Sequence, residues 1–168
     1  FGQKKEDYEM KWVVLSDLHM DFKNCTTKTA RRELLKVLKK ENEEEDISFI
    51  LITGDCLHRN HGDVEKSRAF IQEIGKSCGI EKDRIIICPG NHDIDRDNAI
   101  RNAAIKNYRE HGVLPEVENC LAGYVNFREL YSLVYSERYK PFFFKDVDDF
   151  RVIEIDSCLL SKDDKDYG

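Results

Sequence analysis

The chain has 168 residues, which suits one domain, and 40% of them are hydrophobic, enough to fill an ordinary core. With 27 basic and 33 acidic residues, its formal net charge is −6. This charge argues against a broad, positively charged surface for nucleic acid, but it is compatible with a local basic groove. No apolar run approaches the ~18 residues of a membrane span, and the amino end does not form a signal peptide.

Six dispersed cysteines without a C-x-x-C pair are typical of reduced intracellular thiols in a chain that holds its own core. We therefore expect a cytoplasmic protein with no membrane partner. A single domain is expected over residues 1–168. Residues 1–10 are interpreted as a leader or an expression remnant ahead of a natural start at Met10.

Three short, unbroken apolar runs predict strands that are covered on both faces, as in a parallel sheet. These runs are residues 12–15, 47–52 and 85–88. Helical periodicity over residues 29–40 and 64–77 places a helix after each of the first two strands. The resulting order, strand–helix–strand–helix–strand, favours right-handed crossovers and a layered α/β fold.

The second half of the chain predicts two more helices and a hairpin. A helix over residues 98–111 is expected to end at Gly112. An aromatic-rich helix over residues 124–139 presents a face that we expect to pack in the core. Residues 142–144 and 150–155 predict two strands joined in a hairpin.

Polar side chains follow each of the three predicted buried strands. Asp17 and His19 lie in SDLH after the first strand, and Asp55 lies in GDCLHR after the second. The third strand is followed by GNHD, which contributes Asn91 and His92. Because the carboxyl ends of parallel strands meet at one edge, we expect these loops to converge on neighbouring strands. Their oxygen and imidazole donors suit Mn, Fe or Zn.

In order and spacing, SDLH, GDCLHR and GNHD resemble the first three motifs of the calcineurin-like metallophosphoesterase superfamily. The similarity covers residues 12–93, and the later FRVIEIDS is similar to the next strand of that family. The resemblance implies a layered α/β sandwich. It also implies hydrolysis of phosphomonoester or phosphodiester bonds at a dinuclear metal centre, with a bridging hydroxide as the nucleophile.

The resemblance assigns a metal-binding role to four residues of this chain. Asp17 and His19 would bind the first of two divalent ions (Mn, Fe or Zn), Asp55 would bridge both, and Asn91 would bind the second. The substrate would be a phosphate ester: a nucleotide, a nucleic acid or a small metabolite.

Other residues of the motifs receive roles in catalysis and substrate binding. His92 would stand beside the metals, contact the substrate and assist the leaving group, and Arg59 would contact phosphate. Gly54 and Gly90 would allow close approach of the backbone. Asp93 is expected to orient its own loop.

The chain departs from the family pattern at two points. His58 stands where protein phosphatases of the superfamily carry an aspartate that orients the catalytic histidine, and we expect a solvated loop position for it. After His92 the chain contains only His111, whereas the family completes its centre with three later histidines. We therefore expect a domain that is incomplete on its C-terminal side and weakly active or inactive without that remainder. The alternative is a non-catalytic sensor or scaffold module that retains the fold.

Overall fold

The computed structural model describes residues 10–20, 25–58 and 62–161, with the side chains of residues 25 and 26 left out. The predicted strands and helices occur in the expected order, and the structure adds the short helix α4 and several 3-10 turns (η) that were not predicted. In chain order they are β1 (Lys11–Leu15), α1 (Cys25–Glu44), β2 (Ile47–Thr53), α2 (Val64–Cys78), η1 (Lys82–Arg84), β3 (Ile85–Cys88), η2 (Asn91–Asp93), α3 (Ala99–His111), α4 (Val117–Cys120), η3 (Leu121–Gly123), α5 (Val125–Tyr135), β4 (Phe142–Val147) and β5 (Phe150–Ile155).

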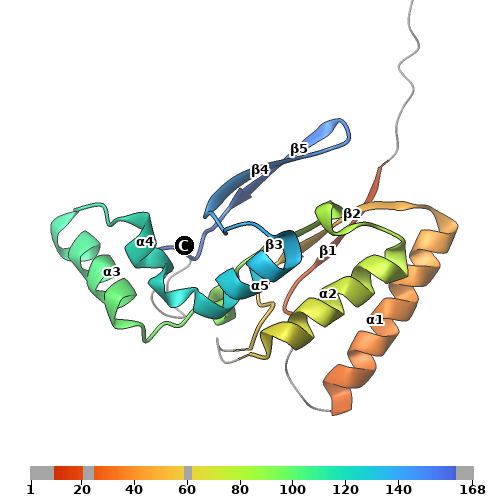
Figure 1. Ribbon diagram of the computed structural model, residues 1–168, viewed down its shortest axis with the longest axis horizontal. Helices are drawn as coiled ribbons and strands as arrows, with labels where there is room; N and C mark the ends of the chain where they lie inside the picture. The colour runs from red at the N-terminus through yellow and green to blue at the C-terminus, as the bar shows by residue number, and fades with distance from the viewer. Residues whose placement is uncertain (1–9, 21–24, 59–61, 162–168) are drawn as a thin grey trace, which may run out of the picture.

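A three-stranded parallel sheet in the order β1–β2–β3 forms the centre of the molecule (Figure 1). Leu15 pairs with Ile52, and Thr53 pairs with Cys88, so the three strands end almost level with one another. The predicted layered α/β fold is confirmed, and so is the expectation that the motif loops leave neighbouring strands. Within the described residues, no helix has both the length and the apolar composition needed to cross a membrane.

Helices α1, α2 and α5 cover one face of the parallel sheet and enclose the main core. Phe127 and Leu130 of α5 are fully buried there, which confirms that the aromatic stripe packs in the core. The helix ends at Tyr135, earlier than expected, because Ser136 takes a left-handed conformation. The Tyr135 hydroxyl accepts a hydrogen bond from the Ile87 N–H and donates one to the Ile85 carbonyl, which satisfies the open edge of β3.

The opposite face of the parallel sheet is covered only in part. The antiparallel hairpin β4–β5 packs Val147 against Phe49 and Ile86. Trp12 and Val14 of β1 alternate outward and are about half exposed, at 52% and 49%. The prediction that the first strand is covered on both faces is therefore wrong, because the hairpin lies over β2 and β3 and leaves β1 at the margin.

The helix boundaries show what local signals can specify. The N-cap of α3, Asn98, accepts a hydrogen bond from the Arg101 N–H, and Gly112 ends the helix in a left-handed conformation, as expected. Helix α1 is longer than the predicted residues 29–40, because the charged run at its C-terminal end is helical. Exposed ion pairs at i, i+4 spacing, Lys39–Glu43 and Lys40–Glu44, lie along that end.

Candidate metal centre

Backbone pairing continues past the ends of β1 and β2 into the loops that carry the motif residues. The N–H groups of Asp17 and His19 donate to the carbonyls of Gly54 and Asp55, at 3.2 and 2.9 Å. The Met20 N–H donates to the Cys56 carbonyl at 2.9 Å. The two loops are therefore held side by side, and the spacing between their side chains is set by main-chain hydrogen bonds.

The backbone at the candidate ligands adopts a rare conformation. Asp17, His19 and Asp55 have φ angles of 56°, 39° and 52°. Asp and His visit this left-handed region more readily than most residues, but it still has a conformational cost. Such conformations persist where the surroundings over-determine them and gather at functional sites. Here the paired loops supply that constraint.

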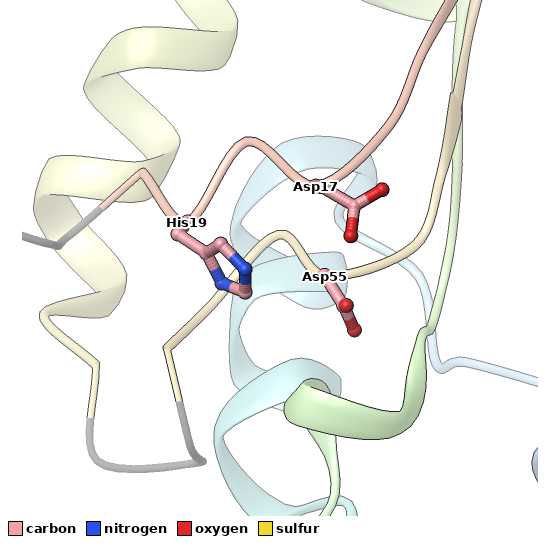
Figure 2. A group of neighbouring side chains, drawn as sticks. All are labelled: Asp17, His19 and Asp55. Atoms are coloured by element: carbon pink, nitrogen blue, oxygen red, sulfur yellow. The ribbon is translucent and has the colours of Figure 1, made fainter. Parts of the chain in front are cut away.

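Three side chains from these loops converge at the edge of the sheet. Figure 2 shows Asp17 and His19 from the loop after β1 and Asp55 from the loop after β2. One ligand atom from each residue lies within 4.8 Å of the others. Asp17 is exposed and Asp55 is only 9% exposed, so the cluster opens to solvent on the Asp17 side. Two carboxylates and an imidazole form a donor set that fits a borderline divalent cation such as Mn, Fe or Zn.

The orientation of the His19 ring fits metal binding. Its Nδ1 lies 3.1 Å from the carbonyl oxygen of Leu57. When Nδ1 carries the proton and donates to this carbonyl, the lone pair of Nε2 is left for a cation. Arg31 of α1 donates to the backbone carbonyl of His19 and so fixes the same residue from the other side.

Asp93 joins the second and third motif loops. This side chain has no exposed surface, and its carboxylate accepts hydrogen bonds from the N–H groups of Gly90, Cys56 and Leu57, at 2.8, 3.1 and 2.6 Å. Burial raises the pKa of Asp93 to about 7, against the opposing effect of the three donors. The expectation that Asp93 orients its loop is confirmed.

The third loop also contacts Asp55 directly. The His92 N–H donates to Asp55 Oδ1 at 2.9 Å, which fixes the carboxylate. Gly54, with a φ of 112°, and Gly90 pack their backbones together beneath it: a Cβ on Gly54 would lie 2.9 Å from Gly90 Cα. The expected close approach at these two glycines is confirmed. Asn91 is half-buried at the start of η2, one residue beyond Gly90.

Three imidazole rings gather beside the candidate metal ligands. The His19 ring centroid lies 5.2 Å from that of His92 and 5.3 Å from that of His58. The rings of His58 and His92 are parallel, at 6.2 Å and 6°. His58 lies in a loop, as expected, but its ring is half-buried in the cluster rather than fully solvated. Its place three residues after Asp55 puts it on the same motif loop, but the sequence does not indicate its contact with His92.

Not every predicted site residue can be placed. Arg59 lies outside the described residues. His111 ends α3, away from the motif loops, and is exposed.

Comparison with known proteins agrees with this geometry. A family model described as calcineurin-like phosphoesterase matches residues 10–163. The chain belongs to this family. A relative from Bacillus subtilis (strain 168), named "Uncharacterized metallophosphoesterase-like protein YydB", is 29% identical over 167 residues. The match covers 91% of this chain but 34% of the relative. The description of this family names phosphoesterases, and the cluster of Asp17, His19 and Asp55 is a candidate site for a divalent metal ion.

Proposed function

We propose that this chain supplies the strand-end part of a metal-dependent phosphoesterase centre that hydrolyses phosphomonoester or phosphodiester bonds. The observation that carries the proposal is the convergence of Asp17, His19 and Asp55, whose ligand atoms lie within 4.8 Å of one another. Family membership supports the reaction class. The substrate would be a nucleotide, a nucleic acid or a small phosphorylated metabolite.

Residues of this chain would contribute ligands to two metal sites. Asp17 and His19 would hold one ion, Asn91 would bind a second through its amide oxygen, and Asp55 would be shared by both. The hydrogen bond from the His92 N–H to Asp55 Oδ1 supports this role, because it holds the shared carboxylate in one orientation. When bound, two divalent ions would activate water as a nucleophile near neutral pH and stabilise charge on the phosphate oxygens.

His92 and Arg59 would act on the substrate. His92 would stand beside the metal ligands and protonate the leaving oxygen, which its position 5.2 Å from the His19 ring supports. Arg59 would contact a phosphate oxygen through its guanidinium group. The parallel His58 ring, rather than an aspartate, would set the orientation of His92 in this chain.

Further ligands for the second ion would come from a C-terminal remainder of the domain. Phe142, Phe144, Ile153 and Ile155 support this part of the proposal, because they share one face of the hairpin and each is more than half exposed. The relative is also much longer than this chain, which matches 34% of it. Without that remainder, weak metal binding and little activity are expected.

The central test replaces the shared carboxylate. In the full-length protein with Mn, hydrolysis of a bis-aryl phosphate should fall by about 100-fold or more in Asp55→Asn, because an amide cannot bridge two cations as a carboxylate does. Asp46→Asn is the matched control: it makes the same chemical change at an exposed position before the opposite end of β2 and should leave the rate unchanged. Full activity in Asp55→Asn would refute the bridging role.

Metal counting separates the enzyme from the alternative of a sensor or scaffold module. That alternative is favoured by the small ligand set of the second site, to which the described residues contribute Asp55 and Asn91. Mass spectrometry of the full-length protein under native conditions should find two ions per chain for a phosphoesterase. One ion or none would favour the non-catalytic module.

A further inference from the structure

A basic groove lies between α1 and α2, beside the candidate metal centre. It encloses about 450 Å³. Its charged lining consists of Lys28, Arg31, Arg32 and Lys66, opposed by Glu73. Its apolar lining is made by Met20, Leu35, Ala69 and Phe70. The combination of an apolar floor and a cationic rim is suited to a ligand that carries negative charge.

The groove is connected to the metal centre through the chain around His19. Met20, which is buried under the groove, directly follows the candidate ligand His19 in the chain. Arg31 donates to the His19 carbonyl, and its guanidinium carbon lies 5.5 Å from the centre of the Phe70 ring. The groove and the metal centre are therefore joined through His19 and Met20, which follow each other in the chain.

The groove lining carries a net positive charge, whereas the chain as a whole is acidic. The whole sequence carries −6, yet four of the five charged residues in this lining are cations. Arg32 and Lys66 have carboxylate neighbours, Glu33 and Asp63, but these pairs are largely exposed. Exposed ion pairs are worth about 0–1 kcal/mol each, so a multiply charged anion can compete for such cations.

Neither end of α1 carries the charges that a helix dipole favours. A helix dipole prefers acidic residues in the first turn and basic residues in the last. Helix α1 has no acidic residue in its first turn and no basic residue in its last. Lys28 lies in its first turn, and Arg31 and Arg32 follow in the second turn beside Glu33. The C-terminal half mixes the cations Lys36, Lys39 and Lys40 with Glu41, Glu43 and Glu44.

We propose that this groove binds a second phosphate group of the substrate, adjacent to the phosphate that reacts at the metal centre. The proposal rests on the proposed phosphoesterase function and narrows its substrate class to compounds with at least two phosphates. Oligonucleotides and nucleoside polyphosphates share this chemistry. Guanidinium and ammonium groups recognise phosphate by charge-assisted hydrogen bonds, and the four cations here can serve one or two such groups.

Binding without metal tests the groove independently of catalysis. The measurement is fluorescence anisotropy of a labelled single-stranded oligothymidylate, with the full-length protein in EDTA. Lys28→Gln/Arg32→Gln should bind about 10-fold more weakly, because fewer counterions are released from the oligonucleotide when a phosphate contact is lost. The slope of log affinity against log salt should also fall by about 0.7 per lost contact. Lys39→Gln/Lys40→Gln is the matched control, since it removes two exposed cations from the other end of the same helix.

Competition identifies the source of the phosphate. If an unlabelled nucleoside triphosphate displaces the oligonucleotide from the wild type but a monophosphate does not, the groove takes a polyphosphate. If only an unlabelled oligonucleotide competes, it takes a nucleic-acid strand. Equal binding by both double variants, whether weakened or not, would overturn the proposal, because the effect would then not depend on the groove.

A single-phosphate substrate separates this proposal from the function of the metal centre. In Lys28→Gln/Arg32→Gln, hydrolysis of the bis-aryl phosphate should fall by less than oligothymidylate binding does, because that substrate has no second phosphate. If no variant hydrolyses it but the anisotropy difference holds, the proposed catalytic function fails and the anion-binding groove stands. Thermal unfolding should show both double variants folded, since all four side chains are exposed.

Discussion

At the candidate metal centre, the atoms of Asp55 leave no room for a side chain on Gly90. Gly90 has a φ of −107°, which any residue can adopt, so glycine is not needed there for its backbone freedom. A Cβ at this position would lie 2.3 Å from Asp55 Oδ1 and 2.4 Å from the Asp55 nitrogen. Both atoms belong to the residue that is proposed to be shared between two ions. The glycine is therefore required by contact, and its loss should act on metal binding.

Gly90→Ala should lower metal affinity by about 10-fold or more, because the Asp55 carboxylate and the loop after β2 must move away from the new methyl group. It should also destabilise the fold by about 1–3 kcal/mol through overpacking. Calorimetric titration with Mn and denaturant unfolding would measure the two effects.

Gly112→Ala provides the comparison at the residue scale. Gly112 has a φ of 67°, and no atom of the described residues lies within 4 Å of an added Cβ, so that variant carries only the backbone cost of about 1–2 kcal/mol. Its metal affinity should match that of the wild type. Equal metal affinity in Gly90→Ala and the wild type would show that Asp55 does not depend on this contact.

At the scale of elements, a buried arginine joins α3 to the segment that follows β5. Arg101 has no exposed surface, and its Nη2 donates to the carbonyls of Cys158, Leu159 and Ser161. The same segment contains Asp156, which accepts hydrogen bonds from the Tyr139 hydroxyl and the Cys158 N–H. These polar contacts, rather than a regular element, position the chain where it leaves β5.

Arg101→Ala should destabilise the fold by about 3–5 kcal/mol, because it removes a buried charge and leaves buried carbonyls and Asp156 without their cation. Arg109→Ala on the exposed side of the same helix should change stability by less than about 0.5 kcal/mol. Urea unfolding of both variants would measure the difference. A small loss in Arg101→Ala would mean that the segment after β5 is not held through α3.

At the scale of the whole molecule, the contact between hairpin and parallel sheet buries an acidic group. Glu154 of β5 is 5% exposed and shares with Phe143 and Lys145 the face of the hairpin that lines a cavity of about 280 Å³ beside α5. Burial, followed by the charge of Asp156, raises the pKa of Glu154 to about 8, and Lys145 opposes the shift. Between about pH 4.5 and pH 8, the Glu154 carboxyl is therefore protonated in the folded protein and ionised in the unfolded chain.

The stability of the fold should consequently depend on pH. Because the folded pKa lies above the unfolded value of 4.5, this contribution is complete below about pH 4.5 and is lost as pH rises through about 8. The wild type should be less stable at about pH 8 than at about pH 5, and Glu154→Gln should show a shallower decline. Urea midpoints across that range would measure it. An identical pH dependence in Glu154→Gln would show that this carboxyl is not the source.

Much of the fold and the candidate site could be predicted from local patterns. Apolar runs and helical periodicity identified all three parallel strands and the helices between them. Polar residues at the strand ends identified Asp17, His19 and Asp55, because level strand ends in a parallel sheet bring their loops together. The metal-binding and catalytic roles assigned to these residues, to Asn91, to His92 and to Arg59 remain predictions.

The order of the predicted strands and helices, and the edge of the sheet at which the motif loops meet, follow from one-dimensional periodicity and parallel pairing. Three features depend instead on how distant segments pack: His58 lies beside His92, Trp12 is half exposed, and Lys28 and Lys66 line one groove. These contacts depend on how each helix is rotated about its axis and how far the hairpin extends across the sheet. Such relations between distant segments arise from packing, and local periodicity does not encode them.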